Sequence, residues 1–248
     1  MARSETPAGA RRPAFYALEP GGWRDWVTLL HLPYTAWHLA YVVVGGCLAA
    51  SVAWGRLSLT VLAFALAMGL GAHALDELRG RPLRTAIPSW ALVALAVSSV
   101  AVACAIGLAV AAETTLWIAP LVVLGAFLVP AYNLELLGGR VHTDVGFGLA
   151  WGAFPVVTAY VAQTGTLRWE AAFAAVWATL LSLAQRRLSR VARRVRRDVV
   201  SVDGLLVNAD GTSEPLDRTA IAAAPEAALR LLTASTLAIA AALVALRL

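Results

Sequence analysis

The sequence predicts an all-α, polytopic transmembrane helical bundle, and three observations lead to that fold class. The chain of 248 residues is 60% hydrophobic and only 14% charged, with a mean hydropathy of +0.72. No ordinary soluble domain of this length has such a composition. Apolar runs long enough to cross ~30 Å of hydrocarbon recur along the chain, and arginines gather between them. We therefore expect one membrane domain whose first partner is the lipid bilayer.

The apolar runs predict seven membrane spans. They cover residues 29–53, 57–78, 88–111, 115–133, 145–163, 171–188 and 226–246. Before the first span, residues 1–22 are polar and contain three prolines, which predicts a flexible tail. Trp23 and Trp26 then favour the membrane interface.

The stretch between the last two spans has a different character. Residues 200–207 alternate apolar and polar side chains, and Asn208 to Gly211 form a typical turn sequence. This pattern predicts a small β-hairpin on the cytosolic side. The expected organisation is therefore a tail at 1–22, a bundle with a basic helical extension at 23–198, a hairpin insert at 199–220 and a final transmembrane helix at 221–248.

The arginines predict the orientation of the chain. All twenty basic residues are arginine, which is typical of a GC-rich bacterial genome. If the N-terminus is cytosolic, seventeen of them fall on the inner side, and only Arg56, Arg168 and Arg247 fall on the outer side. The sequence thus predicts a multi-pass protein of the bacterial inner membrane. The arginine spacing resembles no nucleic-acid-binding module, so we expect no nucleic-acid partner, and a homo-oligomer stays open.

Polar side chains gather at the end of the second span. His73, Asp76 and Glu77 follow one another at i, i+3 and i+4, which places them on one face of a helix. A charged side chain within hydrocarbon is unfavourable by roughly 2.5–3.5 kcal/mol on insertion scales, so such residues are functional candidates. The alternative is a helix end that has reached the lipid headgroups.

Other polar residues are expected at the same side of the membrane. The first span carries His31 and His38 in its inner half, and the inner loop after the fourth span carries Tyr132, Asn133, His142 and Asp144. All four histidines of the chain are therefore predicted to face one side. This arrangement predicts a cytosol-facing polar cavity within the bundle.

A basic stripe follows the sixth span. Arg186, Arg190, Arg193 and Arg197 fall within a narrow helical arc. One interpretation is an amphipathic helix on anionic lipid, where each arginine contributes about 1 kcal/mol. The other is an arginine cluster that binds a phosphate or diphosphate. The sequence leaves both open.

Three stretches of the chain resemble the UbiA superfamily of intramembrane prenyltransferases, and its menaquinone branch in particular. Residues 31–46 are similar to the opening helix of the family. Asp76, followed by Arg-Pro-Leu at 81–83, is similar to its first aspartate-rich motif. Pro-Ala-Tyr-Asn at 130–133 and the glycine-rich run 146–165 are similar to its tyrosine-containing loop and fifth helix. The resemblance implies a UbiA-like helical bundle.

The resemblance also implies a chemistry, from which this chain departs. Family members hold Mg²⁺ on an isoprenyl diphosphate with two acidic motifs. Here His73 and Gly80 stand in place of two aspartates of the first motif, and residues 185–194, where the second is expected, contain no acid. A magnesium site would rest on Asp76 and Glu77 alone, a poor set for octahedral oxygen coordination.

The resemblance and the polar pattern together assign candidate roles. The candidate catalytic residues are His73, Asp76 and Glu77. The candidate substrate-binding residues are Arg81 and Arg84 for diphosphate oxygens, and His38, Tyr132, Asn133, His142 and Asp144 for the acceptor. Arg186, Arg190 and Arg193 are candidates for a diphosphate or for anionic lipid.

Three functions are compatible with these residues. The first is a prenyltransferase-like enzyme acting on an isoprenoid diphosphate, in which arginines replace part of the metal's charge. The second is a non-catalytic membrane protein that binds an isoprenoid or another lipid. The third is a metal-free cyclase or isomerase of a polyisoprenoid that uses the histidine and carboxylate cluster.

Overall fold

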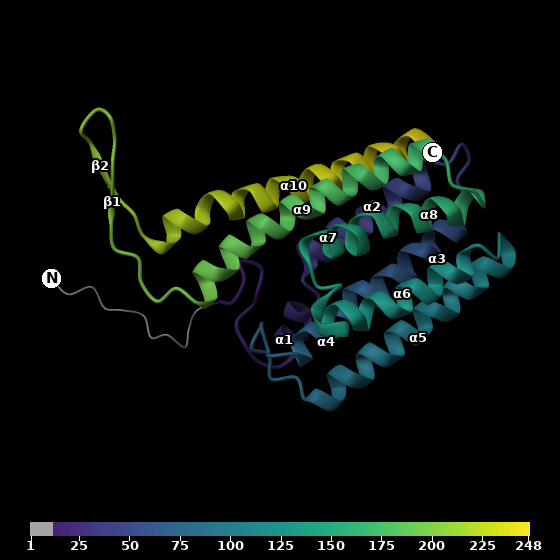
Figure 1. Ribbon diagram of the computed structural model, residues 1–248, viewed down its shortest axis with the longest axis horizontal. Helices are drawn as coiled ribbons and strands as arrows, with labels where there is room; N and C mark the ends of the chain where they lie inside the picture. The colour runs from purple at the N-terminus through teal and green to yellow at the C-terminus, as the bar shows by residue number, and fades with distance from the viewer. Residues whose placement is uncertain (1–11) are drawn as a thin grey trace.

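The structure, a computed structural model, describes residues 12–248, and in this range it is an all-α bundle with one small hairpin (Figure 1). Its helices are α1 (Trp23–Leu29), α2 (Leu32–Cys47), α3 (Trp54–Phe64), α4 (His73–Leu78), α5 (Ser89–Glu113), α6 (Ile118–Asn133), α7 (Asp144–Phe147), α8 (Phe154–Thr164), α9 (Trp169–Arg197) and α10 (Arg218–Arg247). The π-helical segment η2 (Ala65–Ala72) joins α3 to α4, the π-helical segment η4 (Gly148–Ala153) joins α7 to α8, and η3 (Leu137–Gly139) is a short 3₁₀ turn.

The long apolar helices make the chain a candidate multi-pass membrane protein. Within residues 12–248, four helical runs are long and apolar enough to cross a bilayer, namely 54–78, 89–113, 144–164 and 218–247, and α1 with α2 would make a fifth. Helix α6 is apolar but has only 16 residues. Helix α9 carries arginines through its second half and does not meet the same criterion. The expected total of seven spans therefore stays a prediction.

The first expected span is broken in the structure. Helices α1 and α2 meet at an angle of 42°. His31 lies at the break in the left-handed conformation, with φ of 46°, and Pro33 is at the start of α2. Because Pro33 lacks an N–H and fixes φ, it favours the beginning of a new helix. A non-glycine residue at positive φ is strained, and such positions cluster at functional sites.

Small residues bring the central helices close together. A Cβ at Gly45 of α2 would collide with the carbonyl oxygen of Val156 on α8. A Cβ at Gly152 of η4 would lie 2.6 Å from the carbonyl oxygen of Ala178 on α9. Close backbone approach at small residues is the usual basis of helix packing in membranes. These contacts hold α2, η4 and α8 in the middle of the bundle.

Helices α9 and α10 run antiparallel and side by side, and they extend beyond the other helices at one end (Figure 1). There the guanidinium of Arg196 donates to both carboxylate oxygens of Glu226, at 2.5 and 2.8 Å. This hydrogen-bonded pair raises the pKa of Arg196. Helix α10 begins at Arg218, slightly earlier than expected, because the side chain of Asp217 caps it by accepting from the N–H of Ala220 at 2.8 Å.

The predicted hairpin is confirmed. Strands β1 (Leu205–Val207) and β2 (Ser213–Pro215) pair antiparallel, with Leu206 opposite Glu214. Every residue of both strands is exposed, and the hairpin projects away from the bundle near the start of α10 (Figure 1).

The segment before α1 packs against the bundle. Residues 1–11 of the predicted tail lie outside the described residues. In the rest of that predicted tail, Ala14 and Ala17 are buried, and the amide N–H of Leu18 donates to Thr28 Oγ1 at 3.0 Å. The Pro13 carbonyl oxygen accepts from Arg197 Nε at 3.1 Å. The segment thus crosses from α1 to the end of α9.

Candidate functional site

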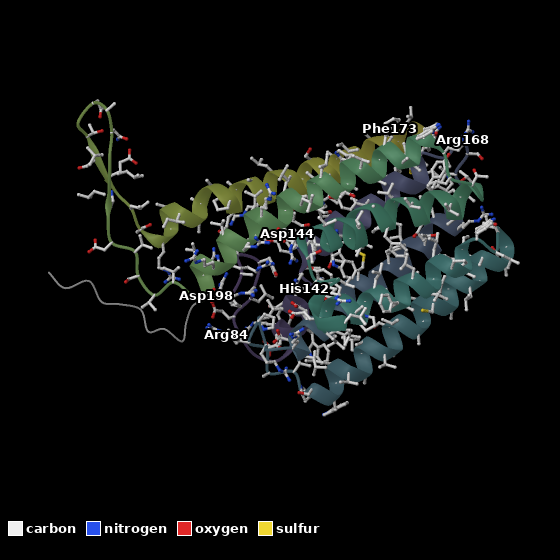
Figure 2. All side chains as sticks on the ribbon, in the orientation of Figure 1. Arg84, His142, Asp144, Arg168, Phe173 and Asp198 are labelled. Atoms are coloured by element: carbon white, nitrogen blue, oxygen red, sulfur yellow. The ribbon has the colours of Figure 1, made fainter. Side chains whose placement is uncertain are left out.

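A polar cavity of about 350 Å³ opens within the bundle. Helix α2, the η2–α4 run, the end of α6 and the loop that follows it, and the second half of α9 surround it, and Tyr16 of the N-terminal segment reaches it. In Figure 2, His142 and Asp144 lie beneath α9, in the half of the molecule that also holds Arg84 and Asp198. Arg168 and Phe173 lie at the far end.

The cavity brings together most of the residues that the sequence singled out. Its lining includes all four histidines of the chain and four arginines. The predicted site residues among them are His38, His73, Asp76, Tyr132, Asn133, His142, Arg186, Arg190 and Arg193. Residues from four separate helices and one loop therefore meet at one place, as the predicted polar cavity requires.

Each of three histidines is fixed by a backbone carbonyl. The Nδ1 atoms of His38, His73 and His142 lie 2.9, 3.2 and 2.9 Å from the carbonyl oxygens of Trp151, Gly69 and Tyr132, respectively. Two of these carbonyls belong to the π-helical segments η4 and η2. A π-helical turn displaces backbone groups from the regular helical pattern and is frequent at functional sites.

The fourth histidine lies at the helix break. His31 stacks on His73 with a ring-centroid distance of 4.1 Å, and Tyr16 packs on His31 at 5.3 Å. His31 is buried, and its Nε2 has no hydrogen-bond partner in the part of the chain that the structure describes. The sequence analysis noted His31 but gave it no role.

The arginines on α9 reach the cavity in different states. Arg186 donates to Asp144 at 2.6 Å and to the hydroxyl of Tyr132, and Arg190 donates to Asp144 at 2.5 Å. Asp144 lies at the start of α7 and does not line the cavity itself. Its predicted contact with an acceptor stays a prediction, while the structure shows it as the counter-ion of two arginines.

Further along α9, Arg193 has no carboxylate within ion-pair distance among the described residues. Its neighbour Arg197, the last member of the predicted basic stripe, also lines the cavity. Burial, and then the nearby charge of Arg193, lower the pKa of Arg197. An anion placed between these two guanidinium groups would offset that repulsion.

Asp76 and Glu77 are separated by the structure although they are neighbours in sequence. Asp76 lines the cavity, and its carboxylate has no hydrogen bond or ion pair within residues 12–248. Glu77 is fully buried outside the cavity lining. Its carboxylate accepts from the N–H of Leu83 at 2.9 Å, and from the N–H and hydroxyl of Thr85 at 2.8 Å each. The structure therefore gives Glu77 a structural position, unlike its predicted role in catalysis and metal binding.

The two predicted diphosphate ligands after α4 also lie outside the cavity lining. Arg81 donates to the carbonyl oxygen of Ile87 at 2.5 Å and to Ser89 Oγ at 2.8 Å, which fixes the turn before α5. Arg84 is exposed. Both arginines have positive φ, 52° and 58°, so this turn directs their side chains differently from a helical continuation. Arginines on α9 occupy the cavity instead.

The residues present do not fit a magnesium site. Octahedral Mg²⁺ requires hard oxygen ligands, usually with at least one or two carboxylates. Asp76 faces the cavity without a second free carboxylate, because Glu77 is turned into its own loop and Glu135 pairs with Arg79 at 2.8 Å. No group of three metal-ligating side chains occurs in the described range. The weak magnesium prediction for Asp76 and Glu77 thus has no geometric support.

An apolar pocket of about 90 Å³ adjoins the polar cavity. Apolar residues of α3, η2, α5, α6, η4 and α8 line it, and Cys104 is among them. Met68 of η2 and Trp151 of η4 line both spaces. The two spaces therefore meet at these side chains, with guanidinium groups on one side and hydrocarbon on the other.

Some lining residues escaped sequence reasoning for identifiable reasons. Tyr16 lies in a segment whose polarity and prolines predicted flexibility, and Gln185 is a single polar residue at the end of an apolar run. Trp151 participates partly through its backbone carbonyl, which no residue pattern reveals.

Comparisons with known proteins found no match to the chain. No family model, no curated protein and no solved structure matches it. The function therefore has to be argued from the site itself.

Proposed function

We propose that the chain is a UbiA-like membrane protein that binds an isoprenoid diphosphate in this cavity and acts as a prenyltransferase-like enzyme. The observation that carries the proposal is the meeting of the two spaces at Met68 and Trp151. An amphiphile with a multiply charged phosphate head and a hydrocarbon tail matches a guanidinium-lined cavity that adjoins an apolar pocket. The resemblance of three sequence stretches to the UbiA superfamily supports the same ligand class.

The arginines on α9 are the proposed head-group ligands. Arg193 has no carboxylate partner in the described range, and the half-buried Arg197 lies one turn further along the same helix. Guanidinium groups bind phosphate oxygens through paired N–H donors, and fixed cations stabilise charge that develops on a leaving diphosphate. In this proposal the arginines supply the positive charge, since the side chains do not fit Mg²⁺.

Two other functions remain candidates because of specific residues. A non-catalytic isoprenoid-binding role is favoured by the structural position of Glu77, which removes one of the three predicted catalytic groups. A metal-free cyclase or isomerase is favoured by the His31–His73 stack beside Asp76, a cluster with acid–base capacity. Orientation with the cavity toward the cytosol, in a bacterial inner membrane, is part of the proposal and follows from the arginine distribution.

Calorimetric titration of the detergent-purified chain with geranylgeranyl diphosphate, in Mg²⁺ and in EDTA, tests the proposal. We expect equal binding in both buffers. Arg193→Gln should weaken binding at least tenfold, since a hydrogen bond to a charged group contributes about 1.5–3 kcal/mol. Arg187→Gln is the matched control, because Arg187 lies on the same helix but is exposed and outside the cavity lining.

Each outcome has a defined meaning. Absence of binding in both buffers refutes the proposed ligand class. Binding that requires Mg²⁺ refutes the metal-free head-group site. Equal weakening by Arg193→Gln and Arg187→Gln would show that the basic helix attracts anions non-specifically, as expected of a surface that binds anionic lipid.

A further inference from the structure

The histidines of the cavity share one hydrogen-bonding arrangement. In His38, His73 and His142, Nδ1 contacts a backbone carbonyl oxygen, at 2.9, 3.2 and 2.9 Å. A carbonyl oxygen only accepts hydrogen bonds, so the ring nitrogen next to it must carry the proton. In a neutral imidazole the other nitrogen, Nε2, is then an acceptor. Three separate backbone segments thus impose the same tautomer.

The three Nε2 atoms are available to a ligand. All three residues line the cavity, and none of the three Nε2 atoms has a hydrogen-bond partner within residues 12–248. None of these atoms is closed off from the surface of the protein. They therefore present acceptor nitrogens to the cavity. An isoprenyl diphosphate offers only acceptor oxygens and hydrocarbon, so it leaves all three without a donor.

A fourth acceptor is present in the same cavity. The carboxylate of Asp76 lines it and has no hydrogen bond or ion pair in the described chain. A ligand that donates a hydrogen bond to this carboxylate would form a charge-assisted bond, which is stronger than a bond between neutral groups.

We infer that the cavity has a second subsite, and that its ligand is a polyhydroxylated, sugar-like acceptor. This inference rests on the proposed function and names the second substrate for the same site. Four acceptor groups, from His38, His73, His142 and Asp76, call for several donors on one molecule. A sugar provides a hydroxyl donor on each of several carbons, whereas a simple phenol provides one.

The subsite defines a balanced transfer reaction. A hydroxyl oxygen of the acceptor forms a bond to C1 of the isoprenyl group. The bond between C1 and the diphosphate oxygen breaks, and its electron pair leaves with the diphosphate, which the arginines of α9 hold. The hydroxyl proton passes to the carboxylate of Asp76. The products are an isoprenyl ether of the acceptor and free diphosphate, with no oxidant, reductant or further reactant required.

The test compares two probes that differ only in hydroxyl groups. Glucose 6-phosphate and (tetrahydropyran-2-yl)methyl phosphate share a ring and a phosphate, and the second has no hydroxyl on its ring. Calorimetric titration at pH 8, where free imidazole is neutral, should give at least tenfold tighter binding of glucose 6-phosphate. A site that binds hydroxyls through buried acceptors rejects ligands without them strongly.

Substitutions at His38 and His142 separate the two ring nitrogens. In His38→Asn and His142→Asn, the side-chain amide keeps a donor near the Nδ1 position and removes the acceptor at Nε2, so the preference for glucose 6-phosphate should fall toward one. His38→Gln places an amide oxygen near the Nε2 position and should restore much of the preference. Binding of geranylgeranyl diphosphate should stay within twofold in all these variants, which also shows that they fold.

The outcomes distinguish this inference from the proposed function. Equal affinity of the wild-type chain for the two probes, with geranylgeranyl diphosphate still bound, overturns the sugar-like acceptor and leaves the diphosphate site standing. Tighter binding of 4-hydroxybenzoate than of glucose 6-phosphate overturns it in favour of a phenolic acceptor. Loss of geranylgeranyl diphosphate binding in the wild-type chain refutes the proposed function itself.

Discussion

Replacing Glu77 tests whether this carboxylate has a structural or a chemical role. Glu77 is fully buried, and its oxygens accept three hydrogen bonds, from the N–H of Leu83 and from the N–H and hydroxyl of Thr85. In Glu77→Gln an amide NH2 group replaces one carboxylate oxygen, so this donor faces either the N–H of Leu83 or the N–H of Thr85, which are donors themselves. One buried donor left without a partner is unfavourable by about 1–3 kcal/mol, and the lost charge weakens the remaining bonds.

We therefore expect Glu77→Gln to destabilise the chain by about 2–4 kcal/mol. For a chain of this length, 1 kcal/mol shifts the midpoint by about 2–4 °C, which gives a decrease in Tm of roughly 10 °C. The assay is thermal unfolding of the detergent-purified protein, followed by circular dichroism. Glu77→Ala should be at least as severe, because it leaves all three donors unpaired.

Asp76→Asn is the matched comparison, since Asp76 precedes Glu77 directly but has no partner in the described chain. Its Tm should stay within about 2 °C of wild type, as expected for a change that removes no contact. Turnover should nevertheless be lost, because Asp76 is the proposed proton acceptor. A Glu77→Gln protein with unchanged Tm and abolished activity would refute the structural role and restore Glu77 to the catalytic group.

Three further predictions concern the packing and orientation of the bundle. Arg196→Met should destabilise the α9–α10 pair by about 2–3 kcal/mol, because it removes both hydrogen bonds to the buried carboxylate of Glu226 and leaves it only the more distant guanidinium of Arg230, at 3.9 Å. Chemical unfolding in detergent measures this change. Gly45→Ala should destabilise the bundle by about 1–3 kcal/mol through collision with the facing helix, whereas Gly55→Ala, which meets nothing within 4 Å, should be neutral or slightly stabilising in the same unfolding assay. A cysteine introduced at Asp210, in a chain without its two native cysteines, should react with a membrane-impermeant maleimide only in inverted vesicles, and labelling in intact spheroplasts would reverse the predicted orientation.

Much of the site could be predicted because polar residues in an apolar chain are informative by their scarcity. His38, His73, Asp76 and Tyr132 stand out from long hydrocarbon runs, and the unfavourable free energy of placing them in lipid implies a shared polar space. The hairpin was equally accessible, since its turn sequence and alternation are local signals. These features need no knowledge of how the helices are arranged.

The roles of neighbouring residues could not be predicted in the same way. Helical spacing placed Asp76 and Glu77 on one face, yet α4 ends at Leu78 and the chain folds back over Glu77 through the turn that follows. The turn begins at Gly80, with φ of 82°, but its direction also depends on the positive φ of Arg81 and Arg84, which arginine as a residue type does not indicate. A single change of backbone direction thus gives Glu77 three hydrogen bonds in the turn and leaves the carboxylate of Asp76 in the cavity.

The charges that line the cavity indicate what kind of ligand it holds. Four arginines line the cavity with two carboxylates: Asp76, which lies in the field of Arg193 and Arg197 without a direct ion pair, and Glu135, which pairs with Arg79. Asp144 pairs with Arg186 and Arg190 from outside the lining and neutralises one of their two charges, so an excess of positive charge remains along α9. A metal cation at that place would add to the repulsion, while an anion would relieve it. The scarcity of free carboxylates and the presence of arginines in the cavity are therefore consistent with each other. Together they favour an anionic ligand that the protein holds directly. The Nε2 acceptors of the cavity histidines receive no hydrogen bond from such an anion, which leaves them for a second ligand that carries donors.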